Sequence, residues 1–303
     1  MSLPGYSICI VHYGEVQLTA ECLRSTLELR YPPQQRFLVW NDPEGSPDSL
    51  PGELLREVEL LQPGKNLGFA AGANLGLQAA LQAGESDAVW LLNNDLRVER
   101  DAARPLAAAL AGDDSVAVAG PRILEYSGMR IWHDGGEIHW PQGRPFSPRL
   151  GQPLGERLPG NPFEVEFISG CAPMMRAKAF QQLGGYDERY FLFYEDADLS
   201  LRLKAQGWRL LQVPAALVRH HGSASVGEAS PRSRYYRLRN RLLFSREHAP
   251  QPVAAAWARR RLRLENRLRA YRYLISGRRA GAKAILSALR DAKAGRWGRG
   301  SEI

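Results

Sequence analysis

The chain has 303 residues and a formal net charge of +8, with 44% hydrophobic and 24% charged residues, which is typical of a soluble globular protein. Its three cysteines (Cys9, Cys22 and Cys171) are widely spaced and form no CxxC pair, which argues against a disulfide framework or a zinc site and favours a reducing compartment. The N-terminus lacks the pattern of a signal peptide and no apolar run approaches the roughly 20 residues that span a bilayer, so we expect a cytoplasmic protein, free or peripherally bound to the cytoplasmic face of the inner membrane.

Short apolar segments alternate with helical patterns in the first part of the chain. Strands are predicted at 7–11, 37–40, 58–61, 88–92 and 116–119, and helices at 18–29, 72–83 and 103–110. This alternation is typical of βαβ units and predicts a mostly parallel sheet flanked by helices. In such sheets ligands bind beyond the carboxyl ends of the strands, where the polar segments that begin at Asn41 and Asn93 fall.

The following part is less regular. Residues 122–162 contain Gly, Pro, Trp and His without clear periodicity, and we expect an irregular segment or a hairpin around Gly135-Gly136 that covers a site. Further on, the patterns predict strand-like structure at 167–176, helices at 178–183 and 196–206, and a last strand at 210–213; Gly207 is expected to end the second of these helices. From Tyr235 onward the chain is predicted to be helical, with breaks at Pro250 and Pro252 and near Gly277.

The positive charge is confined to the end of the chain. Residues 252–303 hold 14 Lys/Arg against 3 Asp/Glu, whereas residues 1–251 hold 26 against 29. We therefore expect a main domain at 1–251 and a basic amphipathic helical extension at 252–303. Apolar residues recur in this extension with heptad-like spacing, and arginines occupy the other faces; the apolar positions are Trp257, Leu264, Leu268, Tyr271 and Ile275.

Three settings suit such an extension. A basic amphipathic helix can lie on an anionic membrane. Its apolar stripe can instead pack on the main domain or on a second subunit of a homodimer. No recognition motif for nucleic acid accompanies the charge, so we expect no nucleic-acid partner.

Two acidic segments are candidates for chemistry. Asp95 follows a predicted strand in the sequence Leu92-Asn93-Asn94-Asp95, where a carboxylate can hold a hard cation that bridges two phosphates; such residues also form simple turns. Glu195, Asp196 and Asp198 open a helix after an aromatic run, a setting that raises a carboxylate's pKa toward the range of a general base. Acidic residues in a first turn also serve as helix caps.

A histidine pair and a segment of small residues complete the candidates. His220 and His221 follow the last strand, where a neutral imidazole can complete a metal site begun by Asp95, although such a pair is more often structural. Between 65 and 76, small residues such as Gly68 let the backbone approach a ligand. This segment matches neither GxxxxGK[ST] nor GxGxxG.

The order of these segments along the chain resembles that of family 2 glycosyltransferases, and is most similar to their rhamnosyltransferase-like branch. The segments that carry the resemblance are 66–74, 92–95, 169–172, 184–188, 193–198, His220 and 239–241. The resemblance covers roughly 7–244 and implies a GT-A-type α/β fold, which is a Rossmann-like, mostly parallel sheet flanked by helices. It implies a nucleotide-sugar donor bound through Mg²⁺ or Mn²⁺, and transfer with inversion. The branch implies L-rhamnose from dTDP-rhamnose, and a bacterial surface glycan or lipid-linked glycan as acceptor.

The resemblance also implies roles for single residues. Asp95 and His220 match the metal-binding positions, with Asn93 at the first acidic position of the motif and His221 as the alternative histidine. Asp196 matches the catalytic base, and the acceptor side comprises its rivals Glu195 and Asp198 together with Gly170 and Cys171. The donor-binding positions are Val11, Tyr13, Asn41, Asp42, Asn66, Gly68, Asn74, Asn93, Asn94, Arg239 and Arg241.

Other functions fit the sequence less well. A sugar-phosphate nucleotidyltransferase would need a glycine-rich basic loop after the first strand, where this chain has His12-Tyr13-Gly14-Glu15. A processive polysaccharide synthase would need membrane spans and usually a QxxRW motif. A non-catalytic sugar- or membrane-binding protein with a transferase fold is compatible with Asn93 and with the order Asn41-Asp42. The joint presence of Asp95, Asp196 and His220 favours an enzyme.

Overall fold

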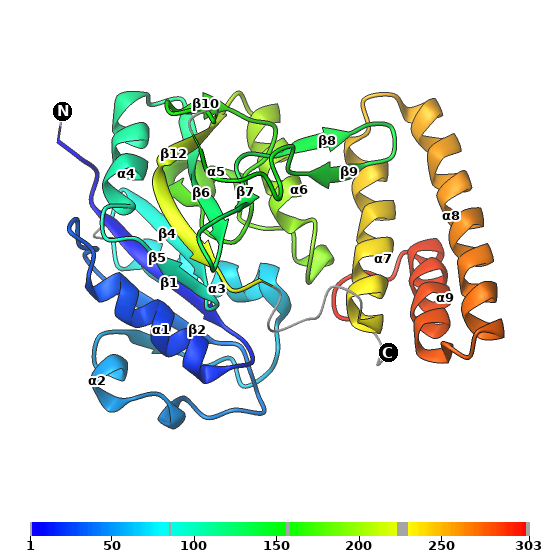
Figure 1. The fold of residues 1–303 in the computed structure, drawn as a ribbon, viewed down its shortest axis with the longest axis horizontal. Coiled ribbons are helices and arrows are strands. Elements are labelled where there is room, and N and C mark those ends of the chain that lie inside the picture. The colour runs from blue at the N-terminus through cyan, green and yellow to red at the C-terminus, as the bar shows by residue number, and fades with distance from the viewer. Residues whose placement is uncertain (1, 85, 156–157, 223–229, 301–303) are drawn as a thin grey trace.

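The computed structural model describes residues 2–84, 86–155, 158–222 and 230–300. Figure 1 shows an α/β part, built around a large sheet, beside a group of three C-terminal helices. The strands of the large sheet are β1 (Tyr6–His12), β2 (Arg36–Trp40), β3 (Glu59–Leu61), β4 (Ala88–Asn93), β5 (Leu96–Val98), β6 (Val116–Glu125), β7 (Ile131–His133), β10 (Phe163–Glu164), β11 (Met174–Arg176) and β12 (Arg209–His220).

The sheet is mostly parallel. Its order in the described residues is β10-β12-β6-β11-β4-β1-β2-β3, with β5 paired to β12 and β7 paired to β6. Strands β4, β1, β2 and β3 run parallel to one another, as do β6 and β12. Between these two groups, β11 lies antiparallel to both of its neighbours. The predicted fold class is confirmed.

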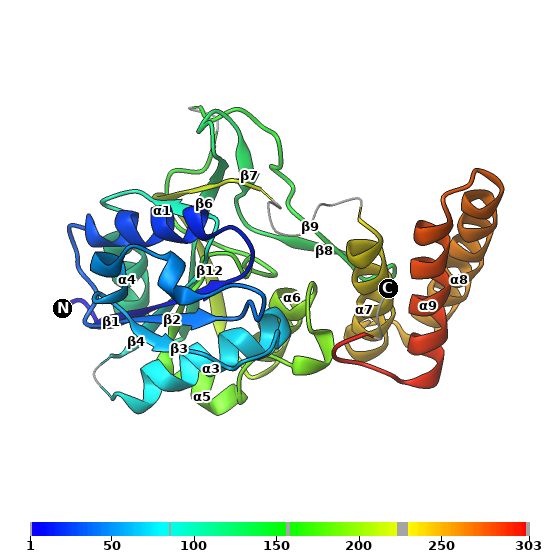
Figure 2. The same ribbon diagram turned by 90° about the horizontal axis from the view of Figure 1, so that it is seen from below.

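Helices cover both faces of the sheet (Figure 2). One face carries α1 (Val16–Leu27) and α4 (Ala103–Gly112), and the other carries α3 (Gly68–Gln82), α5 (Ala177–Leu183) and α6 (Glu195–Ala205). The short elements α2 (Gly52–Leu55), η1 (Pro47–Ser49) and η2 (Glu188–Tyr190) lie in the connections. Side chains of a strand alternate between the faces, so Ile8 and Ile10 of β1 pack with α1, whereas Cys9 and Val11 pack with α3.

The C-terminal helices form a group of their own. They are α7 (Pro231–His248), α8 (Pro252–Ile275) and α9 (Arg279–Ala294), and α9 packs between the other two (Figures 1 and 2). Tyr235 and Tyr236 of α7 share an apolar cluster with Ile285 of α9 and with Phe191 of the α/β part. Helix α7 therefore packs against both parts of the molecule.

The hairpin lies at a different place from the one predicted. Strands β8 (Glu137–His139) and β9 (Arg144–Phe146) pair, and their turn is at 140–143 rather than around Gly135-Gly136. At these two glycines the chain instead passes directly against a neighbouring segment, because a Cβ added to Gly136 would lie 2.1 Å from the ring of Phe167. The hairpin stands beside α7 (Figure 1), with Trp140 stacked on Phe244.

Several elements are longer than the sequence predicts, and one is shorter. Strand β6 continues from the predicted 116–119 to Glu125, into the part that was expected to be irregular. Helix α3 begins at Gly68 rather than at 72, and β12 continues from the predicted 210–213 to His220. Its register shifts between Val213 and Leu217, which lets the strand continue past Pro214 although proline donates no hydrogen bond. Only Met174–Arg176 of the predicted segment 167–176 is a strand. In the described part of the chain, no helix is long and apolar enough to cross a membrane.

Candidate active site

Asp95 and His220 meet at one edge of the sheet. Asp95 lies in the tight turn between β4 and β5, and β5 pairs with β12 so that His220 stands opposite Leu96. The pairing places His220 Nε2 3.2 Å from Asp95 Oδ2, and both side chains are buried. The neighbouring His221 instead contacts Glu21. His220 is therefore the histidine that joins Asp95.

The chemistry of this edge suits a divalent cation. Asp95 Oδ1, His220 Nδ1 and Asn93 Oδ1 are buried and have no hydrogen-bond partner among the described residues. Leaving such atoms unpaired is costly unless a ligand satisfies them. Oxygen ligands suit Mg²⁺ or Mn²⁺, and a neutral imidazole is a common metal ligand. The described residues contain no group of three or more His, Cys, Asp or Glu in position to hold a metal, so a cation here would also need substrate oxygens or water.

A cavity of about 960 Å³ leads from this edge to the start of α6. Asp95, His220, Gly170, Cys171 and Asp196 all line it. Asp196 Oδ2 accepts a hydrogen bond from Gly170 N (3.0 Å), and its Oδ1 accepts one from Ala197 N (2.8 Å). Burial raises the pKa of Asp196, while these N–H donors oppose the rise by favouring the ionised form.

Glu195 lies in a different environment although it is the next residue. It also lines the cavity, but its Oε2 is buried without a hydrogen-bond partner among the described residues. Burial raises the pKa of Glu195 well above its ordinary value, the charge of Asp196 adds to this, and Arg237 opposes it. The two N–H donors thus favour the ionised form of Asp196, whereas burial and the neighbouring charge favour the protonated form of Glu195.

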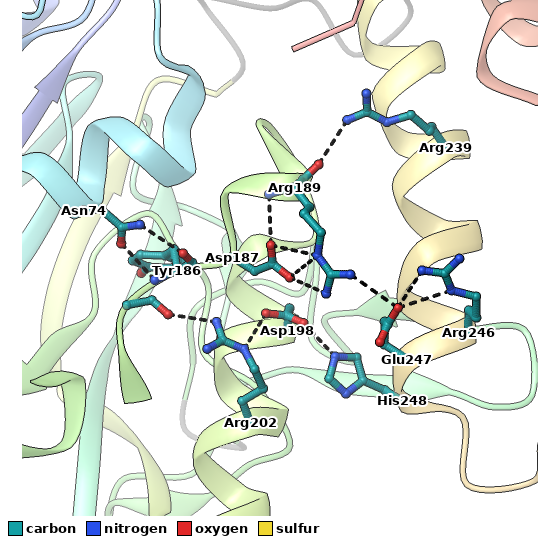
Figure 3. A network of polar contacts seen from close by, with 11 residues as sticks. Asn74, Tyr186, Asp187, Arg189, Asp198, Arg202, Arg239, Arg246, Glu247 and His248 are labelled. Carbon is teal, nitrogen blue, oxygen red and sulfur yellow. Dashed lines mark hydrogen bonds and ion pairs between the residues drawn. The ribbon is translucent and has the colours of Figure 1, made fainter. Parts of the chain in front are cut away.

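Asp198 is committed to an ion-pair network outside the cavity lining (Figure 3). Its two oxygens lie 2.7 Å from Arg202 Nε and 2.7 Å from His248 Nε2, and the carboxylate is buried. Figure 3 shows how this contact ties α6 to α7, close to the pair between Arg189 and Glu247. The structure thus separates Asp198 from the acceptor side that the resemblance implies for it.

The loop that precedes α6 is strained and is held from α7. Phe191, Phe193 and Tyr194 have φ values of 59°, 69° and 77°. Such values cost a non-glycine residue about 1–3 kcal/mol each and persist only where the surroundings hold them. Asn240 Nδ2 donates to the backbone carbonyls of residues 190, 192 and 193 at 2.6, 2.8 and 2.9 Å. Asn240 therefore fixes the path of the loop that carries Glu195 and Asp196.

The two arginines beside Asn240 differ in their relation to the cavity. Arg239 is fully buried, and its guanidinium donates to Asn240 Oδ1 (3.1 Å) and to the Tyr235 hydroxyl (3.2 Å). It does not line the cavity, so the structure places it as a support for Asn240 rather than at the donor. Arg241 lines the cavity and donates through Nε to the carbonyl of Gln142.

Most of the predicted donor-binding residues gather at a second, smaller cavity next to Asp95. Its lining comprises Val11, Tyr13, Asn41, Asn66, Gly68, Phe69, Asn93, Asn94, Asp95, Phe191, Leu192 and Arg232. Asn41 accepts from Leu67 N (2.8 Å) and donates to the Gly68 carbonyl (3.0 Å), which explains why α3 begins at Gly68. Only glycine fits there, because φ is +80° and an added Cβ would lie 2.5 Å from the Phe191 carbonyl oxygen.

Three of the predicted donor residues make contacts within the scaffold. Asn94 donates to Thr19 Oγ1 (2.9 Å), although it also lines the small cavity. Asp42 accepts from Gly14 N (3.1 Å) and so joins the loops that follow β1 and β2. Asn74 exchanges two hydrogen bonds with the backbone of Tyr186 and lies outside both linings (Figure 3).

Several residues that line the cavities or support the site were given no role from the sequence. Arg144, Arg232, Arg237 and Arg269 line one or other cavity, and Asn240 holds the loop without touching the cavity. The spacing of Arg237 and Arg241 by one helical turn is a usable signal, because such residues share a helix face. For Arg144 nothing local distinguishes it from other loop arginines.

The fold and this edge of the sheet together define a GT-A-type glycosyltransferase scaffold, with an aspartate at the end of a central strand facing a cavity. The comparison with known families agrees, because the profile described as glycosyl transferase family 2 matches residues 7–184. The chain belongs to this family.

Curated relatives include rhamnosyltransferases. An N-acetylglucosaminyl-diphospho-decaprenol L-rhamnosyltransferase of Mycobacterium tuberculosis (strain ATCC 25618 / H37Rv) is 30% identical over 202 residues, which cover 60% of this chain and 66% of the relative. The dTDP-rhamnosyl transferase RfbF of Shigella flexneri is 24% identical over 65% of this chain and 66% of its own length. In both cases the match falls just short of two thirds of the relative.

Solved structures share the fold at low sequence identity. GalNAc-T7 with UDP, GalNAc and Mn²⁺ superposes with a TM-score of 0.58 at 18% identity, over 72% of this chain and 43% of that one. The mannosyltransferase PcManGT from Pyrobaculum calidifontis, in complex with GDP-Man and Mn²⁺, gives a TM-score of 0.54 at 16% identity, over 97% and 76%.

Proposed function

We propose that the protein transfers a sugar from a nucleotide-sugar donor to a hydroxyl of a glycan acceptor, with inversion at the anomeric carbon. The observation that carries this proposal is that one cavity contains both the Asp95–His220 pair and Asp196. The Asp95–His220 pair suits the binding of a cation and the donor diphosphate, and Asp196 suits the role of proton acceptor. Membership of glycosyl transferase family 2 supports the same activity.

The roles follow from where each group lies. The acceptor hydroxyl attacks the anomeric carbon, the bond from that carbon to the diphosphate oxygen breaks, and Asp196 takes the hydroxyl proton. Asp95 and His220 would hold Mg²⁺ or Mn²⁺, which offsets the negative charge that develops on the leaving diphosphate. Val11, Asn41 and Asn66 shape the small cavity in which the nucleoside would lie. Inversion needs one carboxylate and no covalent intermediate, which agrees with the assignment of Glu195 as the protonated neighbour.

We further propose dTDP-rhamnose as the donor and a lipid-linked glycan as the acceptor. The names of the relatives from M. tuberculosis and S. flexneri support this choice. Comparing turnover of dTDP-rhamnose with that of UDP-hexoses tests it, with nucleoside diphosphate release measured with and without Mn²⁺. We expect dTDP-rhamnose to be turned over fastest. Faster turnover of a UDP-hexose would overturn the proposed donor. Absence of both hydrolysis and transfer with every donor tested would overturn the proposed transferase activity.

The exposed face of α8 supports a proposal about location. Trp257, Leu264, Leu268, Tyr271 and Ile275 fall within a narrow stripe of this helix, and all are exposed, Trp257 by 66% and Tyr271 by 63%. Exposed arginines lie on both sides of the stripe, at positions 260, 261, 267 and 272. We propose that this face rests on an anionic membrane, which places the catalytic part, at 1–251, beside the surface that presents a lipid-linked acceptor, with 252–303 as its anchor. A homodimer through the same stripe is the alternative outcome.

A further inference from the structure

The cavity continues past Asp196 into a region lined by arginines. Arg144 comes from β9, and Arg237 and Arg241 come from one face of α7. The hydrogen bond from Arg241 Nε to the Gln142 carbonyl (2.9 Å) joins the hairpin to α7, so the three side chains belong to one wall. Burial raises the pKa of Tyr194 to about 12, and the charges of these three arginines oppose the rise, so all three lie near enough to act on the same phenol.

These charges lack fixed counter-ions. Within the described part of the chain, Arg144, Arg237 and Arg241 have no carboxylate at ion-pairing distance, and Arg237 instead stacks 3.9 Å from the ring centre of Phe193. The charge of Arg237 also acts on Glu195 and Asp196, so this arginine links the carboxylates to the rest of the group. The three guanidinium groups give this part of the cavity a positive potential that favours binding of an anion.

Between the C-terminal helices the cavity lining contains aliphatic side chains beside the polar Arg234, Glu265, Asn266 and Arg269. The aliphatic side chains are Leu238, Leu262 and Ile285, from α7, α8 and α9 respectively. A ligand that fills this region would therefore meet guanidinium groups near Asp196 and aliphatic side chains between the helices. A phosphate group with a hydrocarbon chain has this combination of properties.

We propose that Arg144, Arg237 and Arg241 bind the phosphate or diphosphate of a lipid-linked acceptor, whose hydrocarbon chain lies along Leu238, Leu262 and Ile285. The proposal rests on the proposed function and specifies its acceptor site. Guanidinium groups suit phosphate because each can donate two parallel hydrogen bonds. The donor diphosphate belongs at a different place, beside Asp95 and His220, so the cavity would hold two phosphate groups on opposite sides of the transferred sugar.

Binding measurements on the full chain test the site without catalysis. Farnesyl diphosphate is titrated calorimetrically in EDTA, beside farnesol and inorganic pyrophosphate, into the wild type and into the double variant Arg144→Gln/Arg241→Gln. We expect the double variant to weaken farnesyl diphosphate binding about 10- to 100-fold, and to leave farnesol binding unchanged, which also shows that the variant is folded. Arg246→Gln on the same helix, outside the cavity, is the matched control and should bind like the wild type.

Competition separates this site from the donor site. Saturating dTDP should not displace farnesyl diphosphate from the wild type. Raising the salt concentration should weaken the binding of farnesyl diphosphate. Displacement by dTDP, equal binding by the double variant, or no binding by the wild type would each overturn the acceptor site. Loss of farnesyl diphosphate binding in the double variant together with absent donor turnover in the wild type would instead support an anion site in a protein that is not a transferase.

Discussion

His220 Nε2 lies 3.2 Å from Asp95 Oδ2, and this contact joins the end of β12 to the turn after β4. If both residues hold a cation, Asp95→Ala should reduce the Mn²⁺-dependent affinity for the donor. Loss of a residue that only hydrogen-bonds to a metal ligand typically costs about 10- to 100-fold, so loss of the ligand itself should cost at least as much. Calorimetric titration of dTDP-rhamnose with and without Mn²⁺ measures this. The matched control is His221→Ala, which should keep the metal dependence because His221 contacts Glu21 instead. Unchanged metal-dependent affinity in Asp95→Ala would remove this residue from the site.

The strained loop before α6 should depend on Asn240. Asn240→Ala removes one donor from each of three backbone carbonyls, of which that of Tyr190 keeps Leu192 N and Arg239 as donors, so we expect a loss of about 1–3 kcal/mol in the free energy of unfolding. Because the loop positions Asp196, kcat should also fall, while donor affinity should change little. Urea unfolding and steady-state kinetics measure the two effects. Arg246→Gln on the same helix is the control, and an Asn240→Ala protein with wild-type kcat would contradict the positioning role.

Glu195 should make stability depend on pH. Because its pKa is raised by burial, the folded state binds a proton that the unfolded state releases, and stability falls as the pH rises from the ordinary carboxyl range through the raised pKa. Glu195→Gln cannot ionise in either state and so avoids this loss; it should be more stable than the wild type at neutral pH and nearly equal to it at about pH 4. Thermal unfolding across this range tests the prediction. A variant that is less stable than the wild type at neutral pH would show that Glu195 is ionised and stabilised.

The face of α8 should carry membrane binding. Trp257→Ser/Leu268→Ser removes two exposed apolar side chains from the stripe, so co-sedimentation with anionic vesicles should fall several-fold while turnover of a soluble acceptor is kept. Leu286→Ser, an exposed position on α9, is the control. Binding of the wild type should weaken as salt is raised. If the wild type does not bind vesicles even at low salt, the stripe is a packing or dimer surface.

The sequence predicts the α/β core well because local patterns determine it. The strands predicted at 7–11 and 88–92 are β1 and β4, which the structure shows to pair in parallel. The sequence suggests that a histidine of the pair 220–221 joins Asp95, and the resemblance indicates His220. The strand β5 that brings them together is not predicted, because three residues are too few to give a pattern.

The burial of Arg239 could not be predicted from the residues next to it in the sequence. Its burial depends on Tyr235 and on the carbonyls of residues 189 and 190, which the fold brings together from distant segments. The same holds for Asp198, whose partner His248 lies on another helix. In both cases a polar residue in a motif serves the scaffold that positions the site.

The assignment of Asp196 as the base is tested most directly by separating donor binding from transfer. Asp196→Asn should bind dTDP-rhamnose with near wild-type affinity but transfer the sugar about 10²–10⁴-fold more slowly, because an amide is nearly isosteric but cannot take the proton. Asp198→Asn, measured in parallel, should lower stability through the lost contacts to Arg202 and His248 while keeping turnover within a few-fold. Near-normal turnover in Asp196→Asn, with either Glu195→Gln or Asp198→Asn inactive, would contradict the account by moving the base to a neighbouring carboxylate.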